Sequence, residues 1–294
     1  MIEVIFVVVS LILLAIASYN DTKTKEVPDW ISYSLITIGF SLSLLASIVN
    51  KDYKIILFSV IGFAIMYLIA LVMYYTKQWG GGDAKLLMGL GTMFYYYPKF
   101  LLNYFHPSIE NIPFIIIIFI NLIIYGAIYS LIWTVFLSIK NKKHFKIRFK
   151  EIYNSPSTLT IRKIGVLMSF ILIILSLFAV QEKNLLPLFI LLSTFPVIFV
   201  YTFILMKTVE LSSMIKRISI DRLTEGDWII YDIHDKNKLI YSSKSTGVTK
   251  EQINKIKSLR IHSVTIKEGI PFVPSFLISL ILSFIFGNPI TLLI

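Results

Sequence analysis

Long apolar runs constrain this 294-residue chain more than any other feature of its sequence. A helix of about 20 apolar residues is long enough to cross a bilayer. Hydrophobic residues make up 56% of the chain and charged residues only 15%, a balance that excludes a soluble domain of this size. The sequence therefore predicts an all-α polytopic membrane protein with about eight transmembrane helices, at residues 2–19, 31–49, 55–75, 84–105, 113–139, 164–180, 185–206 and 271–290.

Two of these runs contain signals that shorten a helix. Tyr95-Tyr96-Tyr97-Pro98 resembles an interfacial aromatic belt, so we expect the fourth helix to end early. The last run stops at Gly287-Asn288-Pro289 and is short enough to form either a crossing or a tilted, re-entrant segment.

The positive charges predict an orientation. With the long segment 207–270 left out, twelve Lys and Arg residues fall in connections on one side and four on the other. This bias places the N-terminus outside the cell and the connections near residues 21 and 83 on the cytoplasmic side. The net charge of +11 is then explained by residues that flank apolar spans and face anionic membrane lipids, and we expect no nucleic-acid partner. The basic connection 140–150 is expected to be a solvated loop facing lipid.

Segment 207–270 is predicted to be a small cytoplasmic α+β module. Short strands are expected at 228–231, 239–241 and 263–266, and a helix capped by Thr249 and Gln252 should run to Leu259. It contains no nucleotide-binding loop and no catalytic cluster, which favours an accessory role. The chain thus divides into a transmembrane core (1–206), this module (207–270) and a C-terminal membrane segment (271–294).

Cysteine is absent, which excludes disulfides and thiol nucleophiles. The four histidines are far apart in the sequence and have no ligand spacing. We therefore expect neither a metal site nor a cofactor.

Asp83 follows three glycines in the stretch Trp79-Gly80-Gly81-Gly82-Asp83-Ala84-Lys85. It lies at the edge of an apolar run, where an unneeded charge costs about 2.5–3.5 kcal/mol. Residues without side chains let another backbone or a substrate approach the carboxylate. The alternative is an interfacial turn in which Asp83 caps the next helix.

A second carboxylate favours a functional role for Asp83 over a helix cap. Asp21 sits where the first apolar run ends, at the membrane depth expected for Asp83. Two acids from separate helices that share a proton are the arrangement by which aspartic proteases activate water. Two further acids lie nearby: Asp29, beside Pro28, is expected to cap the second helix, and Glu26 to be a solvated loop charge.

These residues resemble the two-motif signature of the prepilin and preflagellin peptidases, intramembrane aspartyl proteases of the GxGD type. The first motif is Asp21 with Pro28-Asp29-Trp30, and the second, about sixty residues later, is Gly80-Gly81-Gly82-Asp83-Ala84-Lys85. The resemblance covers about residues 1–200. A weaker match at 223–227 and 267–274 is similar to the longer archaeal members, such as the euryarchaeal prepilin peptidase.

The resemblance implies a function and a site. Asp21 and Asp83 would be catalytic, and Gly80, Gly82 and Lys85 would support them. The implied substrates are type IV pilin-like and archaellin precursors, cut at the cytoplasmic membrane face between a short basic leader and a hydrophobic helix. Glu26 and Asp29 are then candidates for binding the leader. The cysteine-bearing loop of long bacterial members is missing, so their N-methyltransferase activity is not implied.

Two other functions stay open at this point. An ion-coupled transporter would also use membrane acids such as Asp21 and Asp83, although its usual internal repeat is missing. A catalytically inert scaffold for pilus assembly is the other. Within the peptidase hypothesis, helix polarity predicts that Asp83, at a helix start, is ionised and that Asp21, at a helix end, carries the shared proton.

Overall fold

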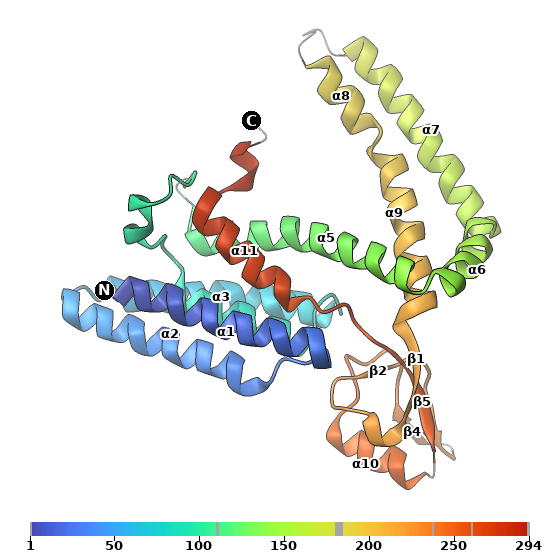
Figure 1. Ribbon diagram of the computed structural model, residues 1–294, viewed down its shortest axis with the longest axis horizontal. Helices are drawn as coiled ribbons and strands as arrows, with labels where there is room; N and C mark the ends of the chain where they lie inside the picture. The colour runs from blue at the N-terminus through green and yellow to red at the C-terminus, as the bar shows by residue number, and fades with distance from the viewer. Residues whose placement is uncertain (1, 110–111, 180–184, 237, 260, 293–294) are drawn as a thin grey trace. The chain divides into compact units, whose positions relative to one another are not determined.

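The computed structural model describes residues 2–109, 112–179, 185–236, 238–259 and 261–292 (Figure 1). The chain forms two compact units. The first comprises Met1–Leu131, Ile218–Val264 and Glu268–Ile294, and the second comprises Ile132–Arg217 and Thr265–Lys267.

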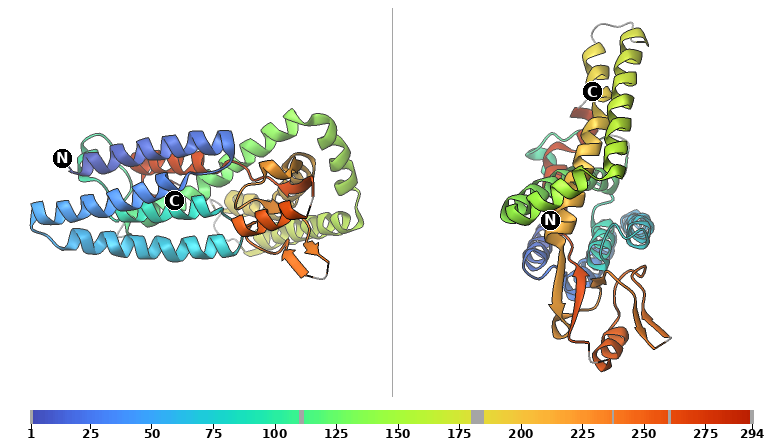
Figure 2. Two further views of the ribbon diagram at one scale, coloured as in Figure 1. Left: turned by 90° about the horizontal axis from the view of Figure 1, so that it is seen from below. Right: turned by 90° about the vertical axis from the view of Figure 1, so that its right-hand side faces the viewer.

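The membrane part of the first unit is a bundle of helices that run side by side (Figure 2). Helix α4 packs against both α2 and α3, and α1 packs against α2 and α11. The elements are α1 (Ile2–Thr24), α2 (Asp29–Asn50), α3 (Lys54–Tyr75), α4 (Gly81–Met93), η1 (Lys99–Asn103), the first part of α5 (Phe114–Lys140), α11 (Val273–Phe286) and η4 (Pro289–Leu292).

Glycines set the distance between α4 and its neighbours. A Cβ atom on Gly91 would lie 2.6 Å from the carbonyl oxygen of Gly62 in α3, and one on Gly89 would lie 2.7 Å from Leu35 Cδ2 in α2. Small residues at such crossings let the two backbones approach closely, which is how helices pack in a membrane. The centre of α4 is consequently buried, including Leu87.

The predicted number of about eight membrane spans is not confirmed. Among the residues that the structure describes, six helices are long and apolar enough to cross a membrane: 2–24, 29–50, 54–75, 114–140, 156–178 and 186–214. The fourth and the last expected spans are shorter: α4 has 13 residues and α11 has 14. Helix α4 ends at Met93, directly before the aromatic stretch, as expected. The chain is a mostly helical, multi-pass membrane protein.

The second unit is dominated by a helical hairpin in which α7 packs against α8 and α9 (Figure 1). Ser176 and Ser193 are hydrogen-bonded across it at 3.0 Å. The run expected at 185–206 consists of two consecutive helices that meet at Thr194, and Pro196 lies in the first turn of the second, where proline is favoured. The elements of this unit after the end of α5 are α6 (Lys142–Tyr153), α7 (Pro156–Ala179), α8 (Leu186–Ser193), α9 (Phe195–Val209) and the π-helical turn η2 (Glu210–Met214).

The basic connection after α5 is a helix, so the expectation of a loop is wrong. Phe145, Phe149 and Tyr153 recur every four residues in α6 and stack in sequence, with ring centroids 5.8 and 5.4 Å apart. Such i,i+4 aromatic contacts stabilise a helix. The lysines between them remain exposed.

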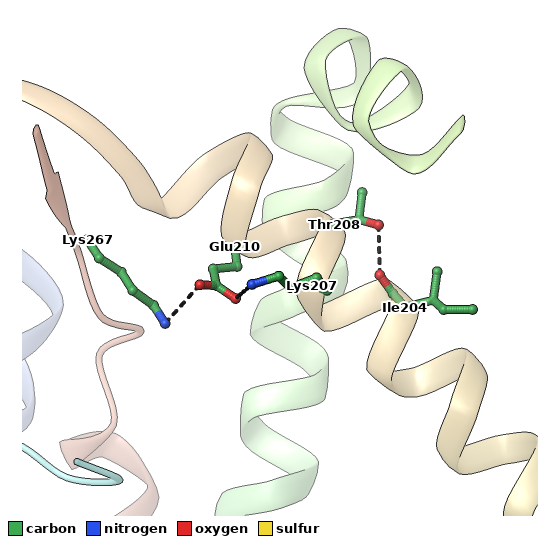
Figure 3. Close-up of polar contacts among 5 residues, drawn as sticks. All are labelled: Ile204, Lys207, Thr208, Glu210 and Lys267. Carbon is green, nitrogen blue, oxygen red and sulfur yellow. Dashed lines mark hydrogen bonds and ion pairs between the residues drawn. The ribbon is translucent and has the colours of Figure 1, made fainter. Parts of the chain in front are cut away.

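A three-residue ion cluster lies at the end of α9 (Figure 3). The carboxylate of Glu210 receives Lys207 Nζ at 3.1 Å on one oxygen and Lys267 Nζ at 3.0 Å on the other. Lys207 precedes the π-helical turn and Lys267 ends strand β5 (Ser263–Lys267). Glu210 therefore links segments that are far apart in the sequence.

The polar module contains two small sheets and a capped helix. Strands β1 (Ile215–Ser219), β5 and β2 (Trp228–Ile229) form one sheet in the order β1-β5-β2. Strands β3 (Ile233–Asp235) and β4 (Lys238–Tyr241) pair antiparallel, with Asp235 opposite Lys238. Strands are confirmed within 228–231, 239–241 and 263–266, whereas β1 and β3 were not expected from the sequence.

The helix expected after Thr249 is confirmed as α10 (Lys250–Ser258). The backbone N–H of Gln252 donates to Thr249 Oγ1 at 3.3 Å, and that of Thr249 donates to Gln252 Oε1 at 2.9 Å. This reciprocal capping box satisfies two backbone donors at the helix start.

The α3–α4 contact gives the first prediction. Alanine has a higher helix propensity than glycine, which would stabilise an uncrowded helix by about 1 kcal/mol. Gly91→Ala should instead destabilise the protein by about 1–3 kcal/mol, because the added Cβ meets the Gly62 backbone. Thermal unfolding in detergent micelles measures the effect. The control is Gly269→Ala, where a Cβ would meet no atom within 4 Å; equal unfolding temperatures for both variants would contradict the packing argument.

Candidate active site

Asp21 lies in the last turn of α1 and is buried, with 6% of its surface exposed. The apolar run ends before it, but the helix continues to Thr24, where Lys25 takes a left-handed conformation with φ of 63° and ends it. The Oδ2 atom of Asp21 accepts a hydrogen bond from the backbone N–H of Val273 at 2.9 Å. The carboxylate is therefore desolvated but has a donor at the N-terminus of α11.

Asp83 occupies the third position of α4 and also has a helix-start donor. Its Oδ2 atom accepts the backbone N–H of Gly80 at 3.2 Å. Because glycine has no side chain, this is only one half of a capping box. The capping role considered from the sequence is thus present, and it leaves the other carboxylate oxygen outside that contact.

The structure brings the two carboxylates together. Asp21 is one of the charged groups that act electrostatically on Asp83, although the two come from different helices. Carboxylates that interact in this way titrate as a pair and can share one proton. Such a pair can activate a water molecule and polarise a carbonyl group.

Helix polarity does not indicate which of the two carboxylates carries the shared proton. It placed Asp21 at the unfavourable C-terminal end of α1. The structure adds the N-terminus of α11, whose Val273 N–H stabilises the Asp21 anion. Both carboxylates now have a donor from a helix start, so polarity no longer distinguishes them.

Of the three glycines, Gly82 has the strictest steric requirement. A Cβ atom there would lie 2.8 Å from Val27 Cβ, in the connection between α1 and α2. A Cβ on Gly80 or Gly81 would meet its nearest neighbour only at 3.5 or 3.8 Å, which is ordinary contact. Gly82 is thus the glycine that allows α4 to begin against the segment that follows Asp21.

Lys85 does not pair with Asp83. Its Nζ atom contacts Asp29 Oδ1 at 2.6 Å and lies 5.1 Å from the centre of the Tyr33 ring. The expectation that Asp29 caps α2 is wrong: Pro28 is the N-cap residue and no side-chain cap bond forms, because Asp29 is turned to Lys85. This ion pair joins α2 to α4.

Glu26 is exposed and immediately precedes Val27, the residue that contacts Gly82. Its charge acts on Asp227 of the polar module. Burial raises the pKa of Asp227, hydrogen bonds from Thr224 lower it, and the charges of Glu26 and Glu268 raise it further. Three acidic side chains, Glu26, Asp227 and Glu268, therefore lie near the α1–α2 connection.

Three residues near the pair were not foreseen. The Tyr129 phenol on α5 interacts electrostatically with Asp21. Trp79 is buried and packs its ring against Phe272 and Phe276, at centroid distances of 5.7 and 5.5 Å. The third, Val273, acts through its backbone N–H. Trp79 and Val273 lie in stretches that the sequence singled out, but their roles could not be predicted, because each reaches the site through a contact with a distant segment.

Taken together, these features define a multi-pass membrane protein with two interacting carboxylates on separate helices, Asp21 buried and Asp83 half-buried. Residues 8–131 match the model of the type IV leader peptidase family. Asp21 and Asp83 both lie inside this stretch. This part of the chain is therefore similar to the type IV leader peptidase family.

The similar proteins are archaeal. A preflagellin peptidase of Methanococcus maripaludis is 33% identical over 114 residues, 37% of this chain and 48% of the relative. A preflagellin peptidase of Methanococcus voltae is 31% identical over 136 residues, 45% of this chain and 56% of the relative. The prepilin peptidase EppA of Methanothermobacter thermautotrophicus is 23% identical over 154 residues, 51% of this chain and 40% of the relative. The matched part of the chain spans about half the length of these relatives.

The Lys85–Asp29 pair gives the second prediction. The two side chains are 31% and 65% exposed, and pairs at such sites contribute about 0.2–1 kcal/mol. A double-mutant cycle of Lys85→Met and Asp29→Asn, measured by chemical unfolding, should give a coupling below about 1 kcal/mol. A coupling above about 2 kcal/mol would mean that the pair is desolvated.

Proposed function

We propose that this chain is an intramembrane aspartyl endopeptidase. It removes short basic leader peptides from type IV pilin-like or archaellin precursors, and it uses Asp21 and Asp83. The observation that carries the proposal is the interaction of these two carboxylates within residues 8–131, the stretch that matches the leader peptidase family. The comparisons give no support to the transporter or scaffold alternatives.

The chemistry follows from the pair. One carboxylate in its ionised form accepts a proton from water, and the other in its protonated form donates a hydrogen bond to the scissile carbonyl. Water addition gives a tetrahedral intermediate. Its collapse breaks the C–N bond as the proton taken from water passes from the pair to the leaving amine, which leaves one proton on the pair, as at the start.

The proposal includes the orientation of the chain in the membrane and its contacts with lipids. The N-terminus lies outside and the pair near the cytoplasmic face, on the basis of the Lys and Arg bias. Helix α6 lies between two membrane spans in the sequence, and its exposed Lys143, Lys146 and Arg148 support a contact with anionic lipid headgroups. The domain roles are a peptidase core, an accessory module and a C-terminal membrane segment.

The test of the function is cleavage by each carboxylate variant. Membranes that contain the chain are mixed with pilin-like and archaellin precursors, and a shortened product is sought. Asp21→Asn and Asp83→Asn should each lower the cleavage rate by about 100-fold or more, because each removes one partner of acid–base catalysis.

Asp52→Asn is the matched control, since it makes the same substitution at an exposed aspartate in the connection between α2 and α3, outside the pair. It should insert into membranes as the wild-type protein does and retain most of its activity. Near-normal cleavage by either asparagine variant would refute the catalytic pair.

We further propose that Glu26 binds the basic leader, with a smaller part for Asp29. Glu26 is exposed and lies next to the contact with Gly82, and its charge combines with those of Asp227 and Glu268. The Asp29 charge, in contrast, is balanced by Lys85 at 2.6 Å.

Glu26→Lys should therefore raise the KM for basic leaders by about two- to fivefold, the effect of an ion pair of about 0.5–1 kcal/mol, with little change in kcat. Steady-state kinetics with leaders of different charge measure it. Asp52→Lys, the same reversal in the connection at the opposite end of α2, is the control. A KM that changes equally in both variants would remove Glu26 from the leader site.

A further inference from the structure

The first turn of α11 contacts the segments of both carboxylates. The backbone N–H of Val273 donates to Asp21 Oδ2 at 2.9 Å, and Phe272 contributes a second backbone interaction with the same carboxylate. Val273 is itself fully buried. This hydrogen bond is thus shielded from water, where a donor to a carboxylate has its greatest effect.

The same turn holds the other segment through aromatic packing. Phe272 and Phe276 pack against Trp79, which directly precedes Gly80. Gly80 in turn donates its N–H to Asp83. Gly126 of α5 leaves room for the Phe272 ring, because a Cβ there would lie 2.8 Å from Phe272 Cζ.

The far end of α11 is anchored by buried hydrogen bonds. Asn121 Nδ2 of α5 donates to Ser283 Oγ at 2.7 Å and to the carbonyl oxygen of Gly287 at 2.9 Å. The Tyr97 hydroxyl donates to the carbonyl oxygen of Phe284 at 2.7 Å. These contacts fix the helix, so its N-terminus has a defined position.

We propose that α11, which lies outside the stretch matched by the family model, positions the catalytic pair. Val273 is the positioning residue: its N–H orients Asp21 and stabilises the anionic form, and Phe272 and Phe276 hold the Asp83 segment through Trp79. The inference rests on the proposed function for its catalytic consequence, and on the hydrogen bond alone for the placement of Asp21.

Other titratable groups that interact with Asp21 are unchanged by a substitution at Val273. They are Asp83 of α4, Lys25 at the end of α1 and Tyr129 of α5. A change in the titration of the pair can therefore be assigned to the N–H, provided that a variant removes it and a matched variant keeps it.

The experiment compares Val273→Pro, which lacks the N–H, with Val273→Ala, which keeps it. Proline is tolerated in the first turn of a helix. A backbone ester at 273, made by incorporating the α-hydroxy analogue of valine, removes the same N–H without changing the side chain, and it serves if the proline variant does not fold. Isotope-edited infrared spectra follow the carboxyl band of Asp21, assigned by its loss in Asp21→Asn.

The expected result is that the titration midpoint of this band moves to higher pH by about one unit in the proline or ester variant. The acidic limb of the pH–rate profile should move with it, and kcat should fall by about tenfold at unchanged KM. Val273→Ala should match the wild-type protein in all three measurements.

Equal midpoints in the ester, proline and alanine variants would overturn the inference. Because the infrared titration needs no substrate, it separates this proposal from the proposed function. A midpoint shift in a chain whose wild-type form cleaves no precursor would support the placement of Asp21 by Val273 and refute the peptidase.

Discussion

A desolvated carboxylate in an apolar helix bundle needs a donor, and this requirement organises the membrane part of the protein. Asp21 is buried and obtains its donor from Val273, at the start of a helix that comes 252 residues later in the chain. Asp83 obtains its donor from Gly80, at the start of its own helix. Each acid thus faces a helix N-terminus, where free N–H groups and the helix dipole favour negative charge.

Close packing of α4 is what brings these two sites together. A short helix with glycines at its crossings can approach α2 and α3 more closely than a helix of large residues, and Gly82 lets its first turn rest on Val27. Because α4 is enclosed by neighbouring helices, it does not need the length of a helix that faces lipid across the whole bilayer. Because α4 is short, the segment that contains Asp83 lies within the bundle, close enough to α1 for Asp83 to interact with Asp21.

The polar module also touches the segment that leads to Asp83. The Tyr74 hydroxyl at the end of α3 is hydrogen-bonded to Thr246 Oγ1 at 3.3 Å, and Lys77 Nζ donates to the carbonyl oxygen of Lys244. Residues 268–272 connect strand β5 to Val273. The part of the chain beyond the family match therefore contacts the segment before Asp83 through Thr246 and Lys244. Through residues 268–272 it is also connected to Val273, the donor to Asp21.

Features that depend on local pattern follow from the amino-acid sequence alone. Apolar runs defined a polytopic helical protein, Thr249 and Gln252 defined the start of α10, and the spacing of Asp21 and Asp83 within family motifs selected the pair. Tertiary structure decided the rest: that α4 is a short enclosed helix, that Asp29 binds Lys85 and that Val273 holds Asp21. The two groups of features differ in the sequence distance over which their causes act. Hydrophobic periodicity and capping act over a few residues, whereas the donor that a buried carboxylate finds depends on which distant helix start is packed against it.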